Sequence, residues 1–205
     1  MNALNMHKFQ FLSIPYSQHE ERLRSGIQVN RDSHLIHVCG GGGVFHLGDR
    51  SVRLKRGIVL APPAFTAFWF DIEPPFEMYN IHYQLCLADG AQAETRLRLP
   101  LSFAPEGFDR IEADLRRIHK LIGKGGAAGV KAEAEAHSLV LGHYLNTPLD
   151  QAGSAFPDPR LDKLRCWLAE PKRNRFSADE AAGICLLSVS QMNRRFRQAF
   201  GQSPQ

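Results

Sequence analysis

Two helix-start signals lie eleven residues apart near the end of this 205-residue chain. Ser177–Glu180 has the form Ser-x-x-Glu, and Ser188–Gln191 has the form Ser-x-x-Gln. In such a capping box the serine hydroxyl accepts a backbone N–H three residues on, and the Glu or Gln side chain reaches back to the serine N–H. Two helix starts this close leave room only for a tight turn. The spacing therefore predicts a helix-turn-helix, with helices near 178–186 and 189–200.

The second of these helices separates apolar from polar residues. Its apolar residues recur at i, i+4, i+7 and i+8: Met192, Phe196, Ala199 and Phe200. Arg, Asn and Gln occupy the rest of its circumference, and a short helix of this kind fits the major groove of DNA. The residues that the pattern predicts to contact DNA are Ser190, Gln191, Asn193, Arg194, Arg195 and Arg197. A solvated polar face is the alternative interpretation.

The basic charge of the chain is concentrated around this motif. Residues 160–205 contain nine Lys or Arg and four Asp or Glu, a net charge of +5, whereas residues 1–159 have a net charge of −1. Lys and Arg displace condensed counterions from phosphates, so this charge favours a nucleic-acid partner. We expect Arg173 and Arg175 to contact phosphates. An ordinary solvated helical surface would carry similar charge and stays open as an explanation.

The segment from Gly26 to Leu87 is typical of strands, with runs of β-branched and aromatic residues between turn formers. Strands are expected at 34–39, 44–47, 51–55, 58–61 and 78–87. Gly40–Gly43 is predicted to form a hairpin turn, and Glu73–Pro75 another turn. Strands at this spacing without intervening helices predict an all-β barrel or sandwich.

After Pro105 the apolar residues follow a helical period. A stripe from Ile111 to Ile122 predicts one helix, and a second is expected over 130–145. These two helices are expected either to cover the barrel or to form a dimer seam. Residues 147–158 contain Pro148, Pro157, Gly153 and Ser154 and predict a linker. A third short helix is expected over 159–170, with Asp158 as its N-cap and Pro159 at its first position.

The predicted fold class is therefore α+β, with a cupin-like domain at 1–146, a linker at 147–158 and a helical unit at 159–205. The four cysteines are widely spaced and predict reduced thiols rather than disulfides. The N-terminus lacks a secretion signal, and Pro62 and Pro63 interrupt the longest mostly apolar stretch. We expect a cytoplasmic protein that does not enter a membrane.

The helix-turn-helix resembles that of the AraC/XylS transcription regulators. Ala182, Ser188, Phe196 and the run Gly201-x-Ser203-Pro204 fall at the spacing of that family's first helix-turn-helix. Leu186 departs from the family, which commonly has Gly in the turn. The family continues through a linker helix into a second helix-turn-helix, so the resemblance implies a regulator truncated after the first one.

The N-terminal half resembles the cupin-type sensor domain of the same family, through the runs Gly57–Pro63 and Tyr79–Tyr83. The resemblance implies operator DNA and a small-molecule effector as ligands, and a homodimer as the assembly. Large aromatic residues are mostly core in a barrel, but alternation places some of them toward the interior. The residues expected to line an effector pocket are Phe68, Trp69, Phe70, His82 and Tyr83.

A cupin-like domain also raises the hypothesis of a metalloenzyme. His34 and His37 are three apart on one strand and are expected to face opposite sides, and His46 stands alone. The chain contains no His-x-His pair, so we expect neither a metal nor another cofactor, and no enzyme. Two alternatives stay open: a cupin-type metalloenzyme with an appended helical unit, and a truncated regulator that only dimerises through Ile111–Leu145.

Overall fold

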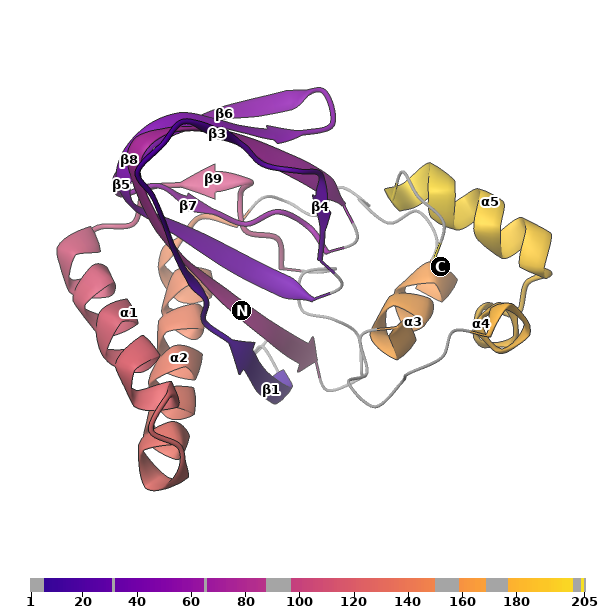
Figure 1. Ribbon diagram of the computed structural model, residues 1–205. Coiled ribbons are helices and arrows are strands. Elements are labelled where there is room, and N and C mark those ends of the chain that lie inside the picture. Colours follow the sequence, from indigo (N-terminus) through magenta and orange to yellow (C-terminus); the bar gives the residue numbers. More distant parts are fainter. Residues whose placement is uncertain are drawn as a thin grey trace.

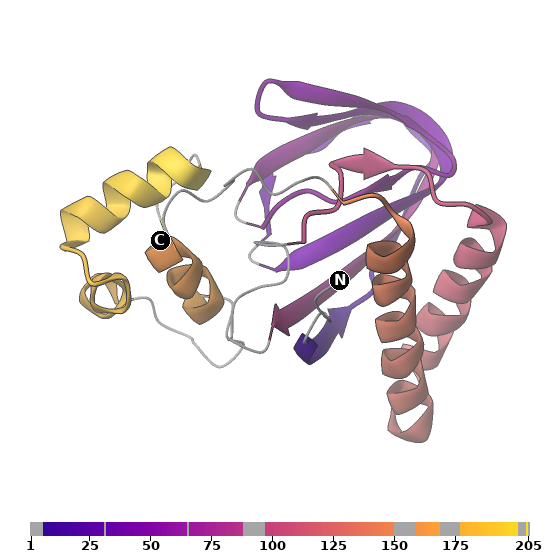
Figure 2. The same cartoon turned by 180° about the vertical axis from the view of Figure 1, so that it is seen from behind.

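The computed structural model describes residues 6–30, 32–64, 66–87, 97–149, 159–168, 177–200 and 204. A large antiparallel sheet lies in the middle of the molecule, with two long helices on one side and a unit of short helices on the other (Figures 1 and 2). This is the α+β class that the sequence predicts. The described strands do not close into a barrel, because the sheet order β1-β8-β5-β7-β9 runs between two separate ends.

Two long strands form the centre of the sheet. β5 (Ser33–Leu47) and β8 (Ala67–Leu87) pair antiparallel from Ser33 opposite Tyr83 to Leu47 opposite Phe68. Four strands pair with β8: β1 (Met6–Ser13), β2 (Tyr16–His19), β3 (Leu23–Arg24) and β4 (Gln28–Val29). Two pair with β5: β6 (Arg50–Lys55) and β7 (Val59–Leu60). The last strand, β9 (Ser102–Phe103), pairs with β7. The sequence does not predict the strands before Gly26: β1 mixes apolar and polar residues and is mostly half-buried, and β2 and β3 are short, with mostly exposed or half-buried residues.

The prediction of a hairpin at Gly40–Gly43 is wrong, and so is that of a turn at Glu73–Pro75. Both segments lie inside the long strands, opposite one another, where the pairing of β5 with β8 is irregular. Gly41 has φ +76°, and a Cβ there would overlap the backbone of Pro75. Glycine lets the two backbones approach, so the segment continues the strand instead of reversing it.

One face of the sheet holds an aromatic core. Phe45 lies between Phe68 and Phe70, with ring centroids 5.5 and 5.2 Å apart. The members of this core that are nearly inaccessible to solvent include Ile36, Val38, Leu54, Leu60, Ile72 and Phe76. Such burial of large apolar side chains is the main stabilising term of the domain.

The other face is covered by α1 (Phe108–Ile122) and α2 (Gly126–Asn146). Leu115, Ile118 and Val140 are fully buried against sheet residues such as Leu35 and Ile81. Of the two roles expected for these helices, the structure shows that they cover the sheet. No described helix is long and apolar enough to cross a membrane. Cys39 is a buried free thiol, as predicted.

The helical unit contains α3 (Pro159–Leu168), α4 (Ala178–Cys185) and α5 (Val189–Phe200). These bounds agree with the expected helices to within two residues. The helices share a small core, whose buried members include Leu161, Leu164, Ala181, Cys185, Met192 and Phe196. The predicted linker falls largely on residues 150–158, outside the described part of the chain.

Candidate nucleic-acid interface and ligand pocket

Both predicted capping boxes form hydrogen bonds. Ser177 Oγ accepts the N–H of Glu180 at 3.3 Å at the start of α4. At the start of α5, Ser188 Oγ accepts the N–H of Gln191 at 3.3 Å, and Gln191 Oε1 accepts the N–H of Ser188 at 3.2 Å. The second box is closed in both directions, which fixes the point at which α5 begins.

The turn between α4 and α5 is centred on Leu186. Leu186 has φ 52° and ψ 43°, in the left-handed region. Its N–H donates to Gly183 O at 3.1 Å, and the N–H of Leu187 donates to Ala182 O at 3.0 Å, which is a Schellman motif. The position thus demands the conformation for which glycine is suited, and leucine adopts it at a cost of about 1 kcal/mol. The side chain is 84% exposed.

α5 is anchored by its apolar face and exposes the opposite one. Met192 and Phe196 are fully buried in the core of the helical unit. Of the six predicted DNA-contact residues, four are exposed on α5: Ser190, Gln191, Arg194 and Arg197. Asn193 and Arg195 are half-buried. Residues of this face also line a wide hollow that is open to solvent: Val189, Ser190, Asn193, Arg194, Arg197 and Gln198.

Not all predicted phosphate contacts can be placed. Arg173 and Arg175 lie outside the described residues. Arg194 and Arg197 are exposed and take part in none of the ion pairs found among the described residues. A guanidinium without a carboxylate partner is available to bind a phosphate or a base edge without first breaking an ion pair.

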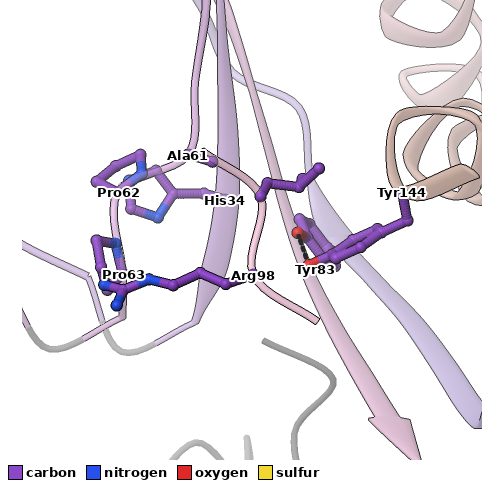
Figure 3. A pocket seen from close by; sticks show the side chains of 8 residues that line it. His34, Ala61, Pro62, Pro63, Tyr83, Arg98 and Tyr144 are labelled. Atoms are coloured by element: carbon purple, nitrogen blue, oxygen red, sulfur yellow. Dashed lines mark hydrogen bonds between the residues drawn. The ribbon is translucent and has the colours of Figure 1, made fainter. Parts of the chain in front are cut away.

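A pocket lies where the connecting segments 61–63 and 98–99 meet the sheet and α2 (Figure 3). Its cavity volume is about 20 Å³, room for about one water molecule, so a larger ligand would have to displace part of the wall. Its lining comes from β5, β8, α2 and two connecting segments: His34, Ala61, Pro62, Pro63, Tyr83, Arg98, Leu99 and Tyr144. The hydroxyl groups of Tyr83 and Tyr144 point toward one another across its inner end, with their oxygens 3.0 Å apart.

The residues predicted to line an effector pocket are divided among three places. Tyr83 lines the pocket. Phe68 and Phe70 belong to the aromatic core, although the Phe68 ring lies 5.4 Å from that of His34. Trp69 lies on the opposite side of β8 from these two rings, because strand side chains alternate, and stacks on His46 at 4.9 Å.

His82, the fifth predicted residue, lies behind the pocket wall. Its ring stacks on His34 with centroids 5.4 Å apart, and its Nδ1 lies 3.1 Å from both carboxylate oxygens of Asp32. No sequence pattern points to Arg98 or Tyr144, which reach the pocket only through the fold. Pro62 and Pro63 belong to the run Gly57–Pro63 that carries the family resemblance.

His34 is held as a neutral side chain with both nitrogens engaged. Its Nε2 lies 3.2 Å from the Asn30 side-chain nitrogen and accepts a hydrogen bond from it, so the ring proton is on Nδ1, 3.4 Å from Asp32 O. Burial, and then the nearby His82, lower the pKa of His34 to about 4. At neutral pH His34 is therefore a rigid, uncharged wall of the pocket.

His37 faces the other way, as expected for two residues three apart on a strand. Its Nε2 lies 3.0 Å from Nε2 of His143 on α2, and both rings are buried. Burial lowers the pKa of both groups, that of His143 to about 4. Among the described residues no group of three or more His, Cys, Asp or Glu side chains is arranged to hold a metal ion.

The pocket and the helical unit share one segment of chain. Pro62 and Pro63 line the pocket, and the next residue, Ala64, is 1% exposed within the core formed by α3, α4 and α5. Ala64 is the one member of that core, among the described residues, that comes from outside the helical unit.

No protein-family model and no curated protein matches this sequence. Solved structures do match. ToxT from Vibrio cholerae O395, solved with a methylnaphthalenyl butenoic acid, superposes with a TM-score of 0.51 at 10% identity, over 95% of this chain and 77% of ToxT. The similarity spans the sheet and the helical unit, so it shows that the two proteins share a fold. At this identity it shows nothing further.

Two other solved structures are more distant. CuxR, described as an AraC-like transcriptional activator, has a TM-score of 0.47 at 7% identity, over 82% of this chain and 61% of CuxR. Salicylate 1,2-dioxygenase from Pseudoaminobacter salicylatoxidans has a TM-score of 0.32 at 10% identity, over 37% of this chain and 23% of the dioxygenase. The chain thus spans less than two thirds of the length of either protein.

Proposed function

We propose that this chain is a DNA-binding transcriptional regulator of the AraC type, responsive to a small-molecule effector, and not an enzyme. The observation that carries the proposal is α5: a helix started by a closed capping box, anchored by Met192 and Phe196, with an exposed polar face. In this arrangement the helix is held rigidly from behind while Arg194 and Arg197 face outward. A rigid helix with this face is suited to the major groove.

The charge distribution supports the same conclusion. The net charge of +5 in residues 160–205 acts over a small helical unit, whereas the sheet half is close to neutral. A local positive field raises the rate of encounter with DNA and makes binding sensitive to salt.

The proposal that binding responds to an effector rests on the shared segment. Pro62 and Pro63 line the pocket, and Ala64, the next residue, is buried in the core of the helical unit. If this segment has two conformations, a ligand that binds one of them more tightly increases its population. Because Ala64 packs with the helices, the packing of the helical unit would change with it. The solved ToxT complex contains a small molecule, which is in keeping with a ligand role for this fold.

Fluorescence anisotropy with labelled duplex DNA across a salt series tests the proposal. We expect binding whose logarithmic affinity falls linearly with the logarithm of salt concentration, with a slope of about −0.9 for each phosphate contacted. Absence of binding even at low salt would contradict it and would favour the interaction-only alternative. Stoichiometric iron or zinc in the purified protein, together with turnover of a substrate, would instead revive the metalloenzyme.

A homodimer is part of the proposal, because two copies of α5 can occupy two half-sites of a symmetric operator. Light scattering after size-exclusion chromatography measures the mass of the full chain directly. A dimer mass with and without DNA supports this arrangement, whereas a monomer that stays a monomer on DNA contradicts it.

A further inference from the structure

We propose that Pro62–Ala64 is the joint that couples the pocket to the helix-turn-helix, so that filling the pocket changes how α3, α4 and α5 pack. The inference concerns the regulation of the proposed regulator, and it depends on that function only for its DNA readout. Pro62 and Pro63 line the pocket and Ala64 is buried in the helical core, within three consecutive residues.

The joint is held firmly at its two ends and weakly between them. On one side, Leu60 pairs with Ile36 of β5, and the N–H of Ala61 donates to Leu101 O at 3.0 Å. On the other side, Ala67 pairs with Val29 at the start of β8. Pro62 and Pro63 have no N–H to donate, so neither is tied to the sheet by such a bond. Among the described residues, movement is therefore confined to Pro62–Ala64 and Thr66, between the two anchors.

Three other residues of the pocket wall are held in place by hydrogen bonds. His34 has hydrogen-bond partners at both ring nitrogens, and Tyr83 and Tyr144 are bonded to each other. A ligand entering the pocket displaces the wall that costs least to move, which is the proline segment. Because the proline rings fix φ at two consecutive residues, only rotation about ψ can absorb the displacement, and most of it passes to Ala64.

Ala64 is placed where a small displacement matters. It is 1% exposed and packs in a core with Leu161, Leu164 and Trp167. Close-packed interiors lose contact energy steeply when a side chain withdraws by less than an ångström, so the core adopts discrete arrangements. The arrangement of this core sets the angle at which α5 is presented, and hence its fit to DNA.

Substitutions can replace the unidentified ligand in a test. Ala61→Leu adds bulk to the pocket wall as a surrogate for occupancy, and Pro62→Gly with Pro63→Gly makes the joint flexible. DNA affinity is measured for the original chain, each variant and their combination. We expect Ala61→Leu to change the dissociation constant at least about 5-fold with the prolines present, and less than about 2-fold in the glycine background. Ala113→Leu, on the exposed side of α1, is the matched control.

Trp167 supplies a second readout that needs no DNA. Its side chain lies in the helical core, and Trp69→Phe removes the other tryptophan of the chain. We expect Ala61→Leu to shift the Trp167 emission, and hydrogen exchange in α4 and α5, only when both prolines are present. Unchanged emission and exchange would overturn the joint even if DNA binds, as would an effect that persists with the glycines. Ala61→Val is the milder substitute if Ala61→Leu does not fold.

Discussion

The sheet and the helical unit each contain a left-handed backbone position, and the two differ in what surrounds them. Gly41 in β5 faces the backbone of Pro75 so closely that a Cβ would overlap it. Leu186, between α4 and α5, has its side chain in solvent. The first position is fixed by a contact between strands that are distant in sequence, and the second by hydrogen bonds within five residues. The sheet therefore tolerates no side chain at its left-handed position, whereas the turn tolerates even leucine.

The sharpest test of this difference is Gly41→Ala. The substitution adds both the strain of a positive φ and a clash with backbone that cannot move without breaking the β5–β8 pairing, so we expect a loss of more than about 4 kcal/mol in the free energy of unfolding. Gly48→Ala is the matched control, because Gly48 has φ +59° with open space around it. It should lose only about 1 kcal/mol. Equal losses in urea unfolding would refute the argument from close approach.

Acid should destabilise the sheet half more than the helical unit. The pKa of His34 and of His143 is lowered to about 4, mainly by burial. The unfolded chain binds protons near pH 6.5 and the folded chain does not, so the stabilisation is complete above pH 6.5 and is lost as the pH falls toward 4. We expect a loss of roughly 3 kcal/mol for each group.

Urea unfolding followed at several pH values measures this loss. His143→Gln removes one of the buried histidines whose pKa is lowered, with His34 and His37, and should make the dependence on pH shallower. The described part of the helical unit contains no histidine, so hydrogen exchange in α4 and α5 should change less across this pH range. A stability that is flat between pH 7 and pH 4 would contradict the burial of neutral histidines.

The contrast between the two halves also explains what the sequence could predict. Ser188 and Gln191 cap a helix through their own neighbours, so the helix start was readable from four residues. Gly40–Gly43 has the composition of a turn, and only its partner segment in β8 shows that it continues a strand. The strand prediction failed there because the deciding contact joins residues about thirty positions apart.

The same reasoning applies to the pocket. Tyr83 was expected because it belongs to a run typical of the family, and alternation correctly suggested that β8 contributes inward side chains. Alternation alone did not tell which side of β8 leads to the pocket, so Phe70 and Trp69 were expected there although they lie elsewhere. Tyr144 pairs with Tyr83 across 61 positions, and no pattern within either segment predicts that contact.

The exposed face of α5 is tested by Arg194→Ala. We expect specific DNA affinity to fall by roughly 1 to 3 kcal/mol in anisotropy titrations at fixed salt, because one guanidinium is lost from the groove. Arg53→Ala removes an exposed arginine from β6 and is the matched control, with little change expected. Similar losses for the two variants would mean that net charge, and not the face of α5, governs binding.

The smallest effect is expected for a substitution in the turn between α4 and α5. Leu186→Gly removes the left-handed strain of leucine, about 1 kcal/mol, but adds conformational entropy to the unfolded chain, which costs about 0.5–1 kcal/mol, so the net gain should be at most about 0.5 kcal/mol. Leu145→Gly, at an exposed residue near the end of α2, should instead cost up to about 1 kcal/mol. Hydrogen exchange compares the two variants, in α4 and α5 for Leu186→Gly and in α2 for Leu145→Gly. If Leu186→Gly destabilised α4 and α5, the exposed leucine would be making a contact that its solvent exposure does not reveal, and the turn would depend on more than its local hydrogen bonds.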